Sequence, residues 1–289
     1  MSGTAPPKPP SPTNPAQKTI LPNPNEEPMP NPYRIITYNI LEGWRNDTIT
    51  GRTLLPGDQR RQAAYTWLAN QRPAVVGLQE LCRFSAAQLA TDAHQWNHPH
   101  SAFLDCGYSI GLTAASPIEV IEQKLDMHHG LLHARVDGID FLVTHFTPHA
   151  ERQQERRQEV AIILERAQTI QQAGRPCLLM GDLNALSPED DALTGPASTK
   201  WYPSSWPLAD GRPDYTTIQA LLDGGLIDPW PHHRAPDTPP FSERPRYDFT
   251  LLSPDLAQRS IGAHYWQNGE TGQWSDHWPV GVDLDWPPA

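Results

Sequence analysis

The segment Gly181-Asp182-Leu183-Asn184 places a carboxylate and a carboxamide two positions apart, directly after the apolar run 177–180. Residues i and i+2 of a β-strand share a face. A buried strand that ends in this way would present hard oxygen and amide groups at the edge of a sheet, where α/β proteins commonly bind ligands. Gly-Asp and Asn are also frequent in turns and caps. The segment therefore predicts either half of a catalytic site or a turn.

Further acidic and amide residues fall at or just beyond the ends of predicted strands elsewhere in the chain. They are Asn39, Glu80, and Asp276 with its neighbour His277. Carboxylates are seldom buried unless paired, and few lysines lie nearby in sequence, so a convergent set would repel itself without a cation. Hard oxygen ligands with one imidazole favour magnesium or manganese as that cation.

Hydrophobic periodicity predicts the elements that must position these residues. Strands are expected at 34–38, 74–78, 108–114, 118–123, 131–136, 139–144, 177–180, 247–252, 261–266 and 280–284. Helices are expected at 58–71, 85–94, 151–173 and 216–222, with a long irregular segment at 188–215. This order predicts α/β layering, and the close spacing of the short strands favours antiparallel pairing.

Composition predicts one large domain preceded by an arm. Residues 1–32 contain 11 prolines and no aromatic residue, and such a segment cannot bury enough surface to offset its ordering entropy. We expect a disordered arm at 1–32 that acts as a spacer or binds a peptide-recognition partner, and a single domain at 33–289. We also expect a monomer.

The remaining composition limits compartment and partners. The chain lacks a run of about 18 apolar residues, so no transmembrane segment is expected. Three scattered cysteines and no secretory signal favour a reducing, cytoplasmic location. A net charge of −11 argues against a broad basic face for nucleic acid, although a bound cation and a few arginines would still allow a transient encounter.

Six short motifs, in order and approximate spacing, resemble the endonuclease/exonuclease/phosphatase superfamily, which includes pancreatic-type deoxyribonuclease and abasic-site endonucleases. The motifs are Tyr38-Asn39-Ile40-Leu41, Gln79-Glu80, Thr144-His145, Gly181-Asp182-Leu183-Asn184, Arg246-Tyr247-Asp248 and Ser275-Asp276-His277. Each is weak alone, whereas six in order are specific. The resemblance covers about 34–284 and implies an α/β four-layer sandwich of two mainly antiparallel β-sheets flanked by helices, with the site at one end.

The resemblance also implies roles for individual residues. Glu80 would be the principal ligand of a magnesium or manganese ion, with Asn39 beside it and Asp276 as a further acidic ligand. Asp182 would orient or deprotonate the attacking water, and Asn184 would fix either the phosphate or Asp182.

Two histidines complete the implied site. His277 would face the scissile phosphate while Asp248 holds its other ring nitrogen, and His145 would contact phosphate or assist the leaving group. Phosphoryl transfer needs in-line geometry and neutralised oxygens more than a covalent nucleophile, so no activated Ser or Cys is required.

These residues predict a divalent-metal-dependent phosphoesterase that hydrolyses a phosphodiester, as a nuclease does. Leu41 stands where relatives that cleave abasic DNA carry Asp, which lowers the DNA-repair interpretation. The alternatives are a phosphomonoesterase or lipid-headgroup phosphodiesterase acting on a small or membrane-borne phosphoester, and a non-catalytic scaffold with an acidic, metal-binding mouth. Activity on a polyanion would fall steeply with salt, whereas activity on a small phosphoester would not.

Other polar and aromatic residues have plainer interpretations. Arg152, Arg156 and Arg157, which alternate with Glu155 and Glu159, are typical of a solvated helix face. Zinc binding and a plain loop or surface position are the two interpretations of the grouped histidines outside the motifs, and the missing Cys or carboxylate spacing favours the second. These groups are His128-His129, His232-His233, and His94, His98 and His100. The aromatic residues Trp201, Tyr202 and Trp206 would stack on bases, cover an apolar headgroup, or pin their loop to the domain.

Overall fold

The computed structural model describes residues 31–45, 48–49, 52–148, 152–194, 213–241 and 244–286. The predicted arm at 1–32 therefore lies almost wholly outside the described residues, as do Trp201, Tyr202 and Trp206. The described residues from Pro32 onward belong to one compact unit.

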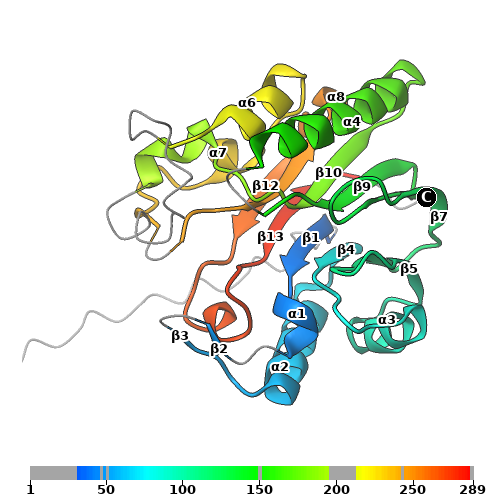
Figure 1. Cartoon of the computed structure of the whole chain (residues 1–289), viewed down its shortest axis with the longest axis vertical. Coiled ribbons are helices and arrows are strands. Elements are labelled where there is room, and N and C mark those ends of the chain that lie inside the picture. Colours follow the sequence, from blue (N-terminus) through cyan, green and yellow to red (C-terminus); the bar gives the residue numbers. More distant parts are fainter. Residues whose placement is uncertain are drawn as a thin grey trace, which may run out of the picture. The chain divides into compact units, whose positions relative to one another are not determined.

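Two mixed sheets form the centre of the fold (Figure 1). The six-stranded sheet has the order β12-β13-β1-β4-β6-β5 and contains β1 (Tyr33–Asn39), β4 (Val75–Gln79), β5 (His100–Leu104), β6 (Ile110–Ala114), β12 (Ser260–Tyr265) and β13 (Val280–Leu284). The five-stranded sheet has the order β11-β10-β9-β8-β7 and contains β7 (Glu119–Lys124), β8 (Leu131–Val136), β9 (Ile139–His145), β10 (Cys177–Asp182) and β11 (Asp248–Leu252). A separate short pair joins β2 (Thr48–Ile49) and β3 (Arg52–Thr53).

Most neighbouring strands are antiparallel, as predicted. The exceptions in the two sheets are β1 with β4 and β9 with β10, which run parallel. Strand β5 was not predicted, because His100 and Ser101 at its start interrupt the apolar pattern. The expected strand at 108–114 begins only at Ile110.

Four helices form the outer layers. Helices α2 (Gly57–Gln71) and α3 (Ala86–Ala93) cover the six-stranded sheet, and α4 (Gln153–Gln172) and α6 (Thr216–Asp223) cover the other (Figure 1). Short elements complete the described chain: α1 (Leu41–Trp44), η1 (His94–Trp96), η2 (Pro188–Leu193), α7 (Trp230–His233), α8 (Pro254–Ala257) and η3 (Thr271–Gln273). The predicted four-layer α/β sandwich is confirmed.

The local sequence explains where the long helices begin and end. The Ser85 hydroxyl accepts a hydrogen bond from the Gln88 backbone N–H and so caps α3. Helix α2 ends at Gln71, because its C-cap Arg72 has a left-handed φ of 49° and Pro73 follows. The predicted helices agree with these elements to within two residues at each end.

Apolar side chains of the two sheets meet in the main core. Ile35 and Leu112 of one sheet and Phe141 and Met180 of the other are fully buried there. Burying each such side chain contributes about 1.5–3 kcal/mol, which holds the two sheets face to face. No described helix is long and apolar enough to cross a membrane, and all three cysteines are free thiols.

Candidate active site

The strand directions bring the sequence-predicted residues to one end of the sandwich. Parallel β1 and β4 end side by side at Asn39 and Gln79, so Glu80 follows next to Asn39. Parallel β9 and β10 end at His145 and Asp182, which are register partners. Antiparallel β11 starts at Asp248, opposite Asp182. The carboxyl ends of the parallel strands and the start of β11 thus share one edge.

Gly181 allows the two parallel strands to end this close together. Its φ is +144°, and a Cβ atom at this position would lie 1.9 Å from the Thr144 carbonyl oxygen. Only glycine adopts such a conformation without strain. The glycine before Asp182 is therefore required by the strand packing, in addition to the turn chemistry that its sequence suggested.

A left-handed turn fixes Asn39 and Glu80. Segment α1, Leu41–Trp44, has four consecutive positive φ angles, between 48° and 68°. Its backbone turns the Leu41 N–H onto Asn39 Oδ1 (3.1 Å) and the Glu42 N–H onto Glu80 Oε2 (2.8 Å). Left-handed non-glycine residues cost about 1–2 kcal/mol each, and such strain persists where surrounding contacts enforce it.

Asn39 links the two halves of the site. Its amide nitrogen donates to Glu80 Oε1 (2.9 Å) and to Asp182 Oδ2 (3.0 Å), across the gap between the sheets. Asn39 and Asp182 are buried, whereas Glu80 is half-buried. One carboxamide therefore sets the spacing of two carboxylates that come from different sheets.

Asp182 is buried beside other acidic groups. Burial, together with the nearby Asp248 carboxylate, raises the pKa of Asp182 to about 7, although His277 opposes the shift. Asn184 donates its backbone N–H to Asp182 Oδ1 (2.9 Å). The predicted shared strand face is wrong here: β10 ends at Asp182, Asn184 has a φ of 44°, and its side chain donates to the Phe146 carbonyl.

His277 and Asp248 form a close pair. His277 Nδ1 lies 2.6 Å from Asp248 Oδ2, and His277 Nε2 lies 3.6 Å from Asp182 Oδ2. Burial opposes a charge on the imidazole, but Asp248, Asp182 and Asp276 outweigh it and raise the pKa of His277 to about 10. The ring is therefore held protonated, with Nε2 directed at Asp182.

His145 approaches the same carboxylate from β9. Its Nε2 lies 3.4 Å from Asp182 Oδ2, and burial with the neighbouring His129 and His277 lowers the pKa of His145 well below its usual value. His145 Nδ1 is buried without a hydrogen-bond partner among the described residues. A neutral imidazole beside an acid is suited to exchanging a proton with a bound group.

Arg244 completes the site and was not predicted. It donates to the Asp276 carbonyl oxygen (2.9 Å) and pairs with the Asp276 carboxylate. Burial opposes ionisation of Asp276, but Arg244 outweighs it and lowers the pKa of that carboxyl. Arg244 lies outside regular structure, so neither periodicity nor the six motifs could have identified it.

The donor set fits a divalent cation. Four carboxylates, of Glu80, Asp182, Asp248 and Asp276, face two cationic side chains, His277 and Arg244. Asp248 Oδ1 and Asp276 Oδ1 are buried without hydrogen-bond partners among the described residues. Ligand atoms of Asp182, Asp248 and His277 lie within 4.8 Å of one another, but a protonated imidazole is a poor metal ligand. The carboxylates and the Asn39 amide are the better donors.

Several residues outside the motifs differ from their expected placement. Arg156 and Glu159 are buried on α4, so the predicted solvated face is wrong at these positions. His98 and His129 are also buried rather than superficial. Their partners come from segments distant in sequence: Pro73 for His98 and Thr147 for Glu159. The charge pattern along a helix does not show which other segments of the chain will bury its side chains.

Comparison with known proteins identifies the family of this chain. The α/β sandwich and its acidic, histidine-bearing mouth fit a hydrolase of phosphoester bonds that uses a divalent metal. The model of the Endonuclease/Exonuclease/phosphatase family matches residues 36–277, and the chain belongs to that family. The superfamily resemblance seen in the sequence is confirmed. No curated relative matches the chain by sequence.

Solved structures share the fold at low sequence identity. An AP endonuclease from Archaeoglobus fulgidus is 17% identical with a TM-score of 0.62, and the match covers 87% of this chain and 99% of that one. The 3' phosphatase NExo from Neisseria, bound to product DNA hairpin, is 17% identical with a TM-score of 0.62, covering 88% and 100%. An endonuclease/exonuclease/phosphatase from Beutenbergia cavernae is 18% identical with a TM-score of 0.57, covering 88% and 71%.

Proposed function

We propose that the chain is a magnesium- or manganese-dependent phosphodiesterase of the nuclease type. The observation that carries this proposal is the unbalanced carboxylate cluster around the protonated His277. Glu80, Asn39 and Asp276 would hold the metal, which, when bound, supplies positive charge to the phosphate oxygens. Two of the structural neighbours are an AP endonuclease and a 3' phosphatase bound to a DNA hairpin, which supports nucleic acid as the carrier of the phosphoester; the endonuclease in particular supports a phosphodiester.

The protein residues divide the work on such a substrate. Asp182 orients the attacking water and takes its proton, because its raised pKa makes it a base near neutral pH. His277, held by Asp248, presents Nε2–H to a phosphate oxygen as negative charge develops there. His145, neutral and beside Asp182, stands near the leaving group. Asn184 holds Asp182 through its backbone N–H.

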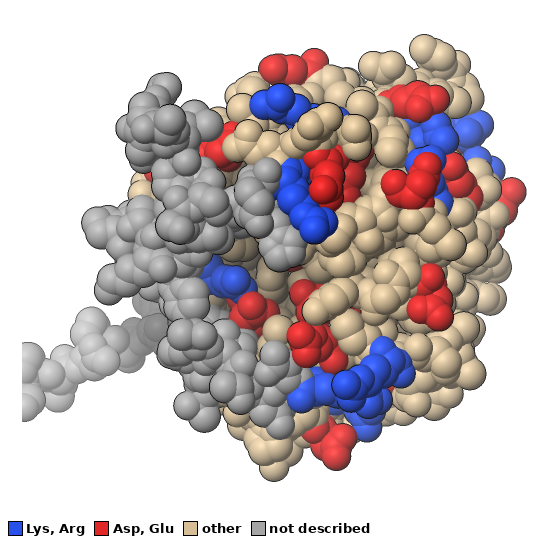
Figure 2. Space-filling model, in the orientation of Figure 1, with Lys and Arg blue, Asp and Glu red and all other residues tan. Residues whose placement is uncertain are grey.

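A smaller phosphoester is the second candidate. The net charge is −11, and the face in Figure 2 shows acidic and basic residues in small separate groups without a continuous basic stripe over the visible described residues. A phosphomonoester or a lipid headgroup needs no such stripe. Raising the salt concentration separates the two candidates, because kcat/KM falls steeply with salt only for a polyanion.

Hydrolysis of bis(p-nitrophenyl) phosphate tests the proposal. We expect turnover with magnesium or manganese, none with EDTA, and large losses in Glu80→Gln and His277→Ala. Glu119→Gln is the matched control, since Glu119 lies on the exposed strand β7 and pairs with Arg135 of β8. Equal rates in wild type, Glu80→Gln and His277→Ala would overturn the assignment as an enzyme.

A further inference from the structure

Four aromatic rings pack against one another between the surface and the active site, and the other three are inclined to the His129 ring by 34° to 62°. The centroid of His129 lies 4.4 Å from that of His145, 5.0 Å from that of Tyr108 and 4.2 Å from that of His128. Tyr108 precedes β6, the two histidines at 128 and 129 precede β8, and His145 ends β9. Three separate segments thus supply one continuous group of rings beside Asp182, the ring wall of Tyr108, His128, His129 and His145.

The outer end of this ring wall is open. Tyr108 is 40% exposed and is the only exposed Phe, Tyr or Trp among the described residues, whereas His129 is 7% exposed and His145 3%. The Tyr108 ring centroid lies 6.4 Å from that of His145, which places the exposed ring at the edge of the active site. The Tyr108 ring therefore contacts the His129 imidazole, tilted by 50°, on its buried side and faces solvent on the other.

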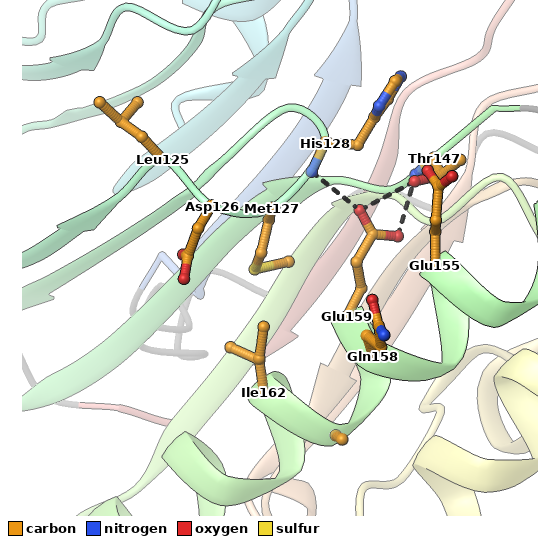
Figure 3. Close-up of a pocket in the computed structure, with 10 residues that line it drawn as sticks. Leu125, Asp126, Met127, His128, Thr147, Glu155, Gln158, Glu159 and Ile162 are labelled. Atoms are coloured by element: carbon orange, nitrogen blue, oxygen red, sulfur yellow. Dashed lines mark hydrogen bonds between the residues drawn. The ribbon is translucent and has the colours of Figure 1, made fainter.

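The buried Glu159 carboxylate fixes the two backbone segments that carry His128 and follow His145. It accepts hydrogen bonds from the His128 backbone N–H (3.3 Å), the Thr147 backbone N–H (3.1 Å) and the Thr147 hydroxyl (3.1 Å) (Figure 3). Arg156 donates to the Thr147 carbonyl oxygen. Helix α4 therefore fixes both the segment that carries His128 and His129 and the chain that leaves His145.

We propose that Tyr108, backed by His129, is a stacking subsite for a planar base attached to the phosphoester. The subsite rests on the proposed function and adds a substrate class to it: a nucleotide unit in a single-stranded or frayed segment, whose base is free to leave its own stack. A lipid chain fits less well, because the polar imidazoles of His129 and His145 border the exposed ring. Base stacking on an aromatic ring changes affinity about 5- to 150-fold per base.

A single-stranded hexanucleotide tests the subsite directly. It has one cleavable phosphodiester, and all its other linkages are methylphosphonates. The two nucleotides that flank the cleavable bond carry thymine, and each in turn is replaced by an abasic nucleotide. For wild type, removing the base on one side should lower kcat/KM about 10- to 100-fold. On the full substrate, Tyr108→Ala should lower kcat/KM by a similar factor. On the substrate that lacks that base, the same variant should lower kcat/KM less than about 3-fold, because the contact between base and ring is already missing.

Two further variants separate stacking from folding. Tyr108→Phe keeps the ring and should retain wild-type base dependence, and Val120→Ala, at an exposed position on β7, is the matched control. Equal losses on all substrates in Tyr108→Ala would show that the ring supports the site without holding a base. No loss in Tyr108→Ala would overturn the subsite as well.

A binding measurement keeps the subsite distinct from the proposed function. In the His277→Ala background, a hexanucleotide with 2-aminopurine beside the central phosphate should lose fluorescence on binding, and Tyr108→Ala should abolish that quenching. Quenching that persists in Tyr108→Ala overturns the subsite and leaves the phosphodiesterase intact. Absence of metal-dependent cleavage of any substrate by the wild type overturns the proposed function, while the quenching result still decides whether a base stacks.

Discussion

A buried aspartate–histidine pair lies near each end of strand β9, although only Asp140 of these four residues belongs to that strand. At its start, Asp140 Oδ1 lies 2.7 Å from His133 Nε2. At its other end, Asp248 Oδ2 lies 2.6 Å from His277 Nδ1, beside Asp182. The two pairs have the same chemistry and nearly the same length, so the hydrogen bond alone does not distinguish a structural pair from a catalytic one.

The surrounding charges make the difference. Asp140 also accepts hydrogen bonds from Arg135 (3.1 Å) and Arg175 (2.9 Å), and although burial opposes this, the three partners lower the pKa of its carboxyl. At the other end, burial and Asp248 raise the pKa of Asp182 to about 7. At the Asp140 end, the carboxylate is neutralised by its arginine partners. At the other end, excess negative charge remains, and a divalent cation would neutralise it.

The matched substitutions Asp248→Asn and Asp140→Asn give the largest contrast. Asp248→Asn removes the acceptor that orients and charges His277, so kcat should fall about 10²- to 10⁴-fold. Asp140→Asn should change kcat less than about 3-fold, because it leaves the acidic end untouched. Assays with bis(p-nitrophenyl) phosphate below the unfolding temperature of both variants measure this. Similar losses in the two variants would remove the distinction between the ends.

Metal binding should distinguish the ends in stability as well. A divalent cation at 100 times its Kd stabilises the folded protein by about 2.7 kcal/mol. Thermal unfolding with and without magnesium or manganese should show this gain in wild type and in Asp140→Asn. In Glu80→Gln the gain should be much smaller, since a main proposed ligand has lost its charge. An undiminished gain in Glu80→Gln would place the cation elsewhere.

The Asp140 end should matter for folding. Asp140→Asn removes the carboxylate that Arg135 and Arg175 share, at a cost of about 1–2 kcal/mol, discounted because the Arg175 side chain is 38% exposed and Arg135 keeps Glu119 as a partner. A carboxyl with a lowered folded pKa contributes above its unfolded pKa of about 3.9 and loses that contribution as the pH falls through the folded value. Urea unfolding should therefore show the full difference from wild type at pH 7 and a smaller one at pH 3. A difference that is unchanged at pH 3 would contradict an ionic origin.

Strand periodicity placed Asn39, Glu80, Asp182 and the Asp276-His277 pair at strand ends, whereas the family resemblance supplied Asp248 and His145. Asn39, Glu80 and Asp182 converge through that placement alone, once β1 and β4, and β9 and β10, run parallel. What the sequence did not reveal depends on contacts between distant segments. Arg244 lies in irregular chain, and Glu159 is a helix-surface charge until Thr147 and the His128 segment cover it.

The conformation of Asn184 was missed for a different reason. A period-two pattern assumes that the strand continues, whereas the left-handed Asn184 ends it and offers a backbone N–H to Asp182 instead. The role that the resemblance implied, holding Asp182, is still compatible with that geometry. The pairing of Asp140 with Arg135, Arg175 and His133 was equally hidden, because a lone Asp near a strand start carries no periodic signal.

The smallest expected effect is a change in the titration of one histidine. In the metal-free protein, His277 should keep its proton until about pH 10, so its contribution to stability is present below its unfolded pKa of about 6.5 and is lost as the pH rises through the folded value. Asp182→Asn removes one of the carboxylates that hold this charge and should lower the pKa of His277 by roughly one unit. NMR titration of the histidine ring protons measures both values. A wild-type midpoint near 6.5 would mean that the acidic end holds no excess negative charge, and its contrast with the Asp140 end would then rest on hydrogen bonds alone.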